Sequence, residues 1–157
     1  ELLAAVMDAM GKSQTPVFLK VAPDLEPADI DDIVDVAMEQ KIAALIISNT
    51  TITRPDLKSA NRSETGGLSG APLKDLALQR LKDFRKASGG QIPLIGVGGI
   101  ATAEDAYERI RAGASLVQLY TAMIYEGPAI AAAMGCQLAK LVKRDGFANI
   151  TEAVGAA

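Results

Sequence analysis

A glycine pair follows an apolar stretch in the second half of the chain. Gly98-Gly99 end the run 92–97, and Thr102 and Asp105 then have the spacing of a helix capping box. Glycines at the end of a buried strand let a ligand approach the backbone, and N–H groups before a helix N-terminus attract anions. Taken alone, the pair is equally typical of a tight strand-to-helix turn. It indicates an anion site only together with the residues around it.

Polar and glycine residues also follow the three other apolar runs. They are Lys20, Ser48-Asn49-Thr50, the glycine-rich stretch from Gly66-Gly67 through Ser69-Gly70, and Tyr120-Thr121. Lys20 offers a fixed positive charge for an anionic ring oxygen, and Asn49 offers donors and acceptors for a ring with carbonyl and N–H groups. Individually, Lys20 could be a solvated strand end and Asn49-Thr50 could form a turn. Because all four runs end in such residues, the set predicts a site for a phosphorylated or anionic cofactor.

The apolar residues alternate between helical and strand spacing along the chain. Strands are expected in 16–23, 43–50, 92–99 and 115–122, and helices in 2–10, 27–37, 73–84, 103–112 and 130–146, with Thr151 capping a short last helix. Strands separated by helices pair in parallel with right-handed crossovers, and four such units are half of a (β/α)8 barrel. The predicted fold class is therefore α/β, as half of a TIM barrel. An open flavodoxin-like sheet is the alternative.

Half a barrel leaves two strand edges and one apolar face of its sheet uncovered. The prediction therefore includes a partner half or self-association. Residues 49–72 join a strand to a helix without an evident element of their own. Because loops longer than about 12–15 residues are usually functional or disordered, this segment is interpreted as a site loop. Its charged residues Arg54, Arg62 and Glu64 are expected to form loop ion pairs or to face solvent.

Composition excludes several classes of function. The 157 residues are 49% hydrophobic and 4% aromatic with a net charge of -3, which gives no reason to expect nucleic-acid binding. No apolar run approaches the roughly 18 residues of a membrane span, and the first residues lack the features of a signal peptide. With no histidine and one cysteine, Cys136, the chain has no His-dependent triad and no internal disulfide, and no metal site is expected. Cys136 is interpreted as an inert thiol on a helix.

Five stretches, with a Gly-Pro just beyond the last of them, together carry a family resemblance. They are LKVAPDL, IISNTTITRP, RSETGGLSGAPL, PLIGVGGIATAEDA and IRAGASLVQLYTA. From about residue 16 to its end, the chain closely resembles the dihydroorotate dehydrogenases of the quinone-linked class 2. The Asn-Thr-Thr, Glu-Thr-Gly-Gly-Leu-Ser-Gly and Leu-Tyr-Thr-Ala motifs make the resemblance specific, whereas the glycines alone would not.

The resemblance implies an FMN-dependent barrel, a flavoprotein oxidoreductase of pyrimidine biosynthesis that oxidises dihydroorotate to orotate and passes electrons to a quinone. It implies FMN contacts for Lys20, Ser48, Ser69 and Gly70, phosphate contacts for Gly98, Gly99, Tyr120 and Thr121, and orotate contacts for Asn49 and Thr50. A flavin phosphate is then the anion expected at the glycine pair.

The chain also departs from the family pattern. Members of the family are roughly twice as long, and their first four strands, their catalytic base serine and their membrane-associating helices have no counterpart here. We therefore expect residues 1–157 to be the C-terminal half of one FMN-binding barrel domain, inactive without the N-terminal half that admits quinone. By resemblance the protein is peripheral to the cytoplasmic membrane, although these residues alone indicate a soluble chain. The alternatives are a non-catalytic phosphate- or FMN-binding half barrel and another FMN-dependent barrel oxidoreductase, such as an NAD-linked class 1 relative.

Overall fold

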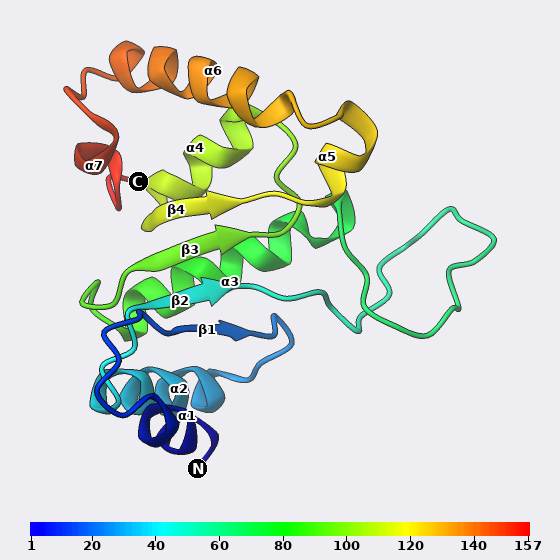
Figure 1. The fold of residues 1–157 in the computed structure, drawn as a ribbon. Helices are drawn as coiled ribbons and strands as arrows, with labels where there is room; N and C mark the ends of the chain where they lie inside the picture. Colours follow the sequence, from blue (N-terminus) through cyan, green and yellow to red (C-terminus); the bar gives the residue numbers. More distant parts are fainter.

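A computed structural model describes all residues from 1 to 157, and a four-stranded parallel sheet forms its centre (Figure 1). The strands β1 (Phe18–Val21), β2 (Ala44–Ile47), β3 (Leu94–Val97) and β4 (Ala114–Gln118) lie in the order in which they occur along the chain. An open doubly wound sheet reverses its strand order at a switch point, and this sheet has no reversal. Sequential order with right-handed crossovers places the helices on one face, as in a barrel. The predicted α/β class is confirmed.

Helices connect the strands. They are α1 (Leu2–Met10), α2 (Pro27–Glu39), α3 (Lys74–Ala87), α4 (Ala103–Arg111), α5 (Thr121–Glu126), α6 (Ile130–Arg144) and α7 (Ile150–Ala153), with a 3-10 turn, η1 (Ala71–Leu73), directly before α3. In Figure 1, α3 runs behind β2 and β3, on the far side of the sheet. None of these helices combines the length and the apolar character that crossing a bilayer requires.

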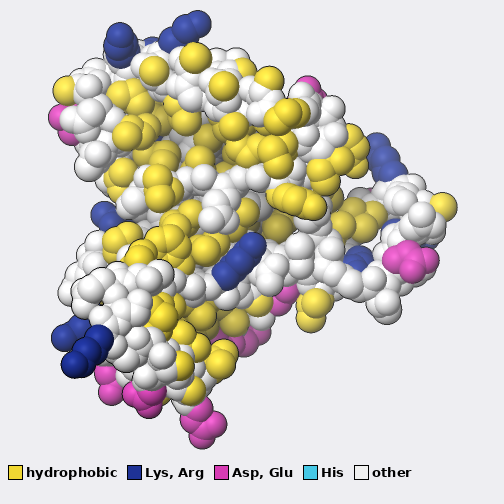
Figure 2. Space-filling view, in the orientation of Figure 1, with side chains coloured by type: hydrophobic (Ala, Val, Ile, Leu, Met, Phe, Trp, Pro, Cys, Tyr) yellow, Lys and Arg dark blue, Asp and Glu magenta, His cyan; other side chains and the backbone are white.

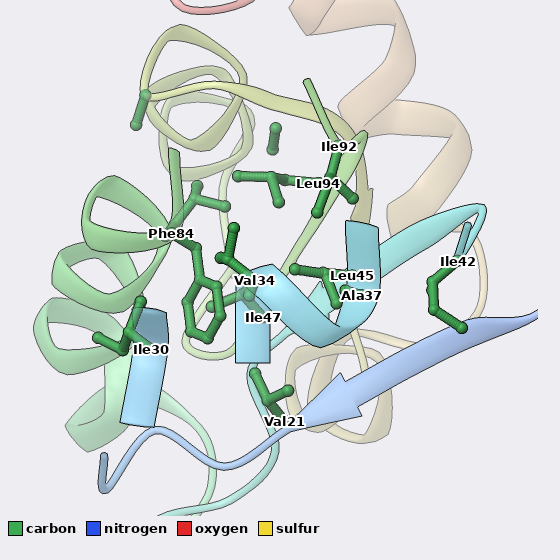
Figure 3. Packing of buried hydrophobic residues seen from close by; sticks show 13 residues of the cluster. Val21, Ile30, Val34, Ala37, Ile42, Leu45, Ile47, Phe84, Ile92 and Leu94 are labelled. Carbon is green, nitrogen blue, oxygen red and sulfur yellow. The ribbon is translucent and has the colours of Figure 1, made fainter. Parts of the chain in front are cut away.

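The main hydrophobic core lies between the sheet and helices α2 and α3 (Figure 3). Leu45, Ile47, Phe84 and Leu94 are fully buried there, and Val34 reaches them from α2. Burying each such side chain contributes about 1.5–3 kcal/mol. Two smaller clusters join α4 to α6. These contacts fix the strand ends relative to the helices that follow them.

The other face of the sheet is not covered by helices. Along β1 the exposed residues Phe18 and Lys20 alternate with the less exposed Leu19 and Val21, so one face packs on the core and the other is open. Phe18 is 47% exposed and Leu116, on β4, is 60% exposed. Figure 2 shows hydrophobic side chains spread over this side of the molecule. This matches the uncovered apolar face expected of half a barrel.

All four strands are shorter than the runs in which they were predicted, and two further predictions were wrong at the end of β4 and at the start of α7. The fourth strand ends at Gln118, and Tyr120 is the N-cap of α5, whose first turn closes when Met123 N–H donates to the Tyr120 carbonyl at 3.0 Å. A short apolar run does not distinguish a strand from a helix, and the run 115–122 contains the end of one and the start of the other. Asn149, not Thr151, caps α7: its Oδ1 accepts the N–H groups of Thr151 and Glu152. An asparagine before the first turn is a strong N-cap, so Thr151 lies inside the helix.

Candidate functional site

A cavity of about 530 Å³ lies at the carboxyl ends of the strands. Its lining includes all ten residues that the sequence singled out: Lys20, Ser48, Asn49, Thr50, Ser69, Gly70, Gly98, Gly99, Tyr120 and Thr121. The carboxyl ends of parallel strands meet at one edge of a sheet, so residues distant in the sequence come together there.

Several residues that line the cavity have free backbone N–H groups. Those of Gly98, Gly99 and Tyr120 donate to no atom of the chain. Gly98 and Gly99 have φ values of 111° and 68°, and a Cβ on Gly99 would lie 2.5 Å from the Cα of Lys74. Only glycine therefore allows the loop to lie against the start of α3. Free N–H groups in such a turn form a concave site for an anion.

The N-terminus of α4 contributes less to these free donors than the sequence suggested. The predicted capping box is present: Thr102 Oγ1 accepts the N–H of Asp105 at 3.1 Å. Asp105 Oδ2 in turn accepts the N–H groups of Ala101 and Thr102 at 2.9 and 3.0 Å. The carboxylate of Asp105 thus already occupies donors that an anion would use. Among the cavity-lining residues 98–102, the free N–H groups are those before the bonded pair, at Gly98, Gly99 and Ile100.

Asp105 also pairs with Lys74, the first residue of α3. Burial raises the pKa of Asp105, but the bonds from Lys74 and from two backbone N–H groups outweigh burial and hold this pKa below its usual range. The hydrogen bond to Asp105 raises the pKa of Lys74. Both groups are therefore charged at neutral pH, and their pair joins α3 to α4 beneath the loop.

Arg109 lies completely buried behind the same loop. Its Nη2 donates to the carbonyl oxygens of Lys74 at 2.6 Å and of Gly98 at 3.1 Å. Burial lowers the pKa of its guanidinium. The sequence reasoning missed Arg109, and no pattern indicates it, because Arg109 and Arg111 both stand in the last turn of α4 and only the fold shows which one turns inward.

The residues at the ends of β1 and β2 also line the cavity. Ser48 is 1% exposed, and its hydroxyl donates to the carbonyl of Asn49 at 3.0 Å. Asn49 Oδ1 accepts the N–H of Thr50 at 2.9 Å, so the turn chemistry considered for this residue is present. Its Nδ2 and the ammonium of Lys20 form no hydrogen bond or ion pair within the chain, which leaves both groups available to a ligand.

The end of the long loop lines the cavity as well. Thr121 Oγ1 donates to Ser69 Oγ at 3.1 Å, and a Cβ on Gly70 would lie 3.1 Å from Thr121 Cγ2. Further back, Thr51 and Leu68 exchange backbone hydrogen bonds of 3.1 and 2.8 Å, which close the stem of the loop. The two ends of the segment 49–72 therefore line the cavity, while its middle projects away from the sheet (Figure 1). The interpretation as a site loop agrees with its two ends.

Arg54 does not form the loop ion pair that was one expectation for it. Its guanidinium donates to the carbonyl oxygens of Ile52, Thr53, Glu64 and Gly66, the last two at 2.8 and 2.6 Å. The fork geometry of arginine suits several carbonyl acceptors at once, so Arg54 ties the two arms of the loop together. Arg62 is exposed and forms no ion pair.

Helix α5 adds two residues that the sequence reasoning did not select. Tyr125 and Glu126 line the cavity, and Tyr125 is 81% exposed. They were missed because 121–126 was not expected to be helical, so these side chains had no predicted direction. An exposed aromatic ring at the rim offers apolar contact area to a ligand or to a further part of the protein.

Comparison with known proteins identifies relatives of the chain. The family model described as dihydroorotate dehydrogenase matches residues 1–142. The chain is 66% identical over 154 residues to a dihydroorotate dehydrogenase (quinone) of Novosphingobium aromaticivorans and 64% identical to one of Erythrobacter litoralis, covering 98% of this chain in both cases. It spans 44% and 45% of the lengths of those relatives.

A solved structure shows the same likeness in three dimensions. The ligand-free DHODH of Eimeria tenella has a TM-score of 0.92 and 39% identity, covering 99% of this chain and 48% of that protein. The complex of DHODH from the same organism with ferulenol has a TM-score of 0.85 and 47% identity, covering 88% of this chain and 37% of that protein.

Proposed function

This chain belongs to the dihydroorotate dehydrogenase family, and from that membership we propose that its cavity binds FMN and one edge of dihydroorotate. The protein would oxidise dihydroorotate to orotate in pyrimidine biosynthesis, with a quinone as electron acceptor. Residues 1–157 would form the C-terminal half of one barrel domain. The quinone and membrane contacts belong, in this proposal, to residues outside 1–157, and so does the surface that covers the open face of the sheet.

The observation that carries the proposal is the set of free N–H groups at Gly98, Gly99 and Tyr120. A phosphate group accepts hydrogen bonds from several such donors at once, and charge-assisted bonds of this kind are about twice as strong as neutral ones. The cavity, at about 530 Å³, is within the usual range for a small-molecule or cofactor site. The donor set and the space therefore fit a phosphorylated cofactor.

When bound, FMN supplies the hydride-accepting chemistry of the reaction. The chain supplies binding and charge around it. Lys20 places an unpaired ammonium at the end of β1, where it would stabilise negative charge on a ring oxygen. Asn49 and Thr50 would hold the edge of the dihydroorotate ring, since the free Nδ2 of Asn49 is a donor for a ring carbonyl. Ser48, Ser69 and Gly70 would line the flavin.

The base that removes a proton from dihydroorotate is assigned to a residue outside 1–157. Ser48 is buried and donates its hydroxyl proton to the Asn49 carbonyl, and Ser69 accepts from Thr121. Neither serine is therefore placed as a free base. We expect a polypeptide of these 157 residues to bind FMN and to leave dihydroorotate unchanged.

The experiment measures bound flavin and turnover separately. The native protein is denatured and its released small molecules are identified by mass spectrometry, with FMN expected. The 157-residue polypeptide, loaded with FMN, is then given dihydroorotate and a quinone analogue, alone and together with the remaining part of a relative's barrel. Orotate is expected only from the combination. Absence of flavin from the native protein would contradict the proposed function, and orotate from the polypeptide alone would contradict only the assignment of the base.

A further inference from the structure

We propose that Arg109 is a positioning residue that aims the phosphate-binding N–H group of Gly99 into the cavity. The inference rests on the proposed function, because it concerns the same FMN phosphate. Arg109 itself does not line the cavity and would not touch the cofactor.

The geometry of one peptide unit connects Arg109 to the cavity. The carbonyl of Gly98 and the N–H of Gly99 belong to the same planar, trans peptide, so they point in opposite directions. Arg109 Nη2 holds the Gly98 carbonyl at 3.1 Å from behind the loop. The Gly99 N–H is therefore turned away from Arg109, and it donates to no atom of the chain. Two glycines in succession could adopt many other orientations, and this hydrogen bond selects one.

Arg109 is itself held firmly. Its Nη2 also donates to the Lys74 carbonyl at 2.6 Å, at the start of α3, and its side chain is fully buried. Gly96 of β3 leaves room for it, because a Cβ there would lie 3.2 Å from Arg109 Cβ. One guanidinium thus connects the start of α3 with the loop after β3. Gly98 and Gly99 of that loop line the cavity, and so does Leu73, the residue directly before α3.

Stability alone does not account for an arginine at this position. Its Nε and Nη1 are buried and have no hydrogen-bond partner. Burying a charged group with unsatisfied donors is costly, and an apolar side chain of similar size would fill the space at lower cost. The Nη2 bonds to two carbonyls are what distinguishes Arg109 from such a side chain. The structure therefore favours a role in orienting the loop over a role in packing.

The test compares the affinities of the native protein and its variants for FMN and for riboflavin, which lacks the phosphate. Dissociation constants are measured on apoprotein by flavin fluorescence. Arg109→Met removes both carbonyl bonds, and Arg109→Lys keeps a charge that can reach one carbonyl. Arg111→Met is the matched control, because Arg111 stands on the same helix and donates instead to the Ala156 carbonyl.

For Arg109→Met we expect about a tenfold loss of FMN affinity, the effect of one misdirected charge-assisted hydrogen bond, with riboflavin affinity unchanged within twofold. Arg109→Lys should lie between this variant and the native protein, and Arg111→Met should bind both flavins as the native protein does. Equal losses for FMN and riboflavin in the Met and Lys variants, or no loss for either, would overturn the positioning role. A native protein that binds FMN no more tightly than riboflavin would instead overturn the proposed phosphate site, and the inference with it.

Discussion

Alanine in place of Gly99 tests how closely the loop after β3 packs on α3. A Cβ at this position would lie 2.5 Å from Lys74 Cα and 2.7 Å from Lys74 N, both backbone atoms that no rotamer change can move. Gly146 provides a matched control. It also has a positive φ, 83° against 68° for Gly99, but an added Cβ there would meet nothing within 4 Å.

The two substitutions share one cost and differ in another. A left-handed backbone conformation costs a non-glycine residue about 1–2 kcal/mol. Alanine also lowers the conformational entropy of the unfolded chain, which stabilises the folded state by about 0.4–1 kcal/mol. We therefore expect Gly146→Ala to lower the free energy of unfolding by between about 0 and 1.6 kcal/mol. Gly99→Ala adds the displacement of the α3 start, which as an overpacking effect costs a further 1–3 kcal/mol, roughly. Because that displacement moves the Lys74 carbonyl that Arg109 binds, FMN affinity should also fall.

Equilibrium unfolding in urea measures the difference, provided that the m-value is the same in both variants. The midpoint should fall clearly further for Gly99→Ala than for Gly146→Ala. If the two variants unfold with free energies within about 0.5 kcal/mol of each other, below the range expected for overpacking, then Gly99 is not tightly packed against Lys74.

Three further changes test other parts of the site. Because the pKa of Asp105 is lowered in the folded protein, its contribution to stability is present above the unfolded pKa and is lost as the pH falls below about 4. Asp105→Asn should therefore flatten this part of the stability–pH curve. An unchanged slope would contradict the lowered pKa of Asp105. Arg54→Ala should speed proteolytic cleavage within 55–63, because it frees both arms of the loop. Lys58→Ala should not change the cleavage rate. Equal cleavage rates for the two variants would show that Arg54 does not hold the loop. Asn49→Ala should weaken dihydroorotate binding about tenfold while FMN remains bound, and Asn61→Ala in the same loop is the control. An unchanged substrate affinity would show that Asn49 does not bind dihydroorotate.

The sheet and the location of the cavity could be predicted from the sequence because both follow from local patterns. Apolar strands that alternate with amphipathic helices determine a parallel sheet, and a parallel sheet brings its strand ends to one edge. That is why residues as far apart as Lys20 and Thr121 line one cavity. The boundary at Gln118 could not be predicted, because the apolar residues on either side of it are equally compatible with a strand and with a helix.

The charged residues behind the site could not be predicted, because their partners are backbone groups distant in the sequence. Arg109 donates to carbonyl oxygens that lie 11 and 35 residues before it in the sequence. Every residue has a main-chain carbonyl, so the pattern of side chains does not indicate which carbonyls accept these bonds. The same reason applies to Arg54, which was expected to form an ion pair or to face solvent. Its guanidinium instead donates to the main-chain carbonyl oxygens of Glu64 and Gly66. Side chains that bind main-chain carbonyls therefore become visible only once the fold is known.

The closed stem of the long loop separates its middle from the cavity. The pair of backbone bonds between Thr51 and Leu68 fixes the distance between the two arms, whatever lies between them. Extending a loop whose ends are already joined costs little, about 0.6 kcal/mol for each doubling of its length. Residues 55–63 are thus a position where the chain can accept an inserted peptide, an affinity tag or a fluorescent label while Asn49 and Ser69 keep their places in the cavity.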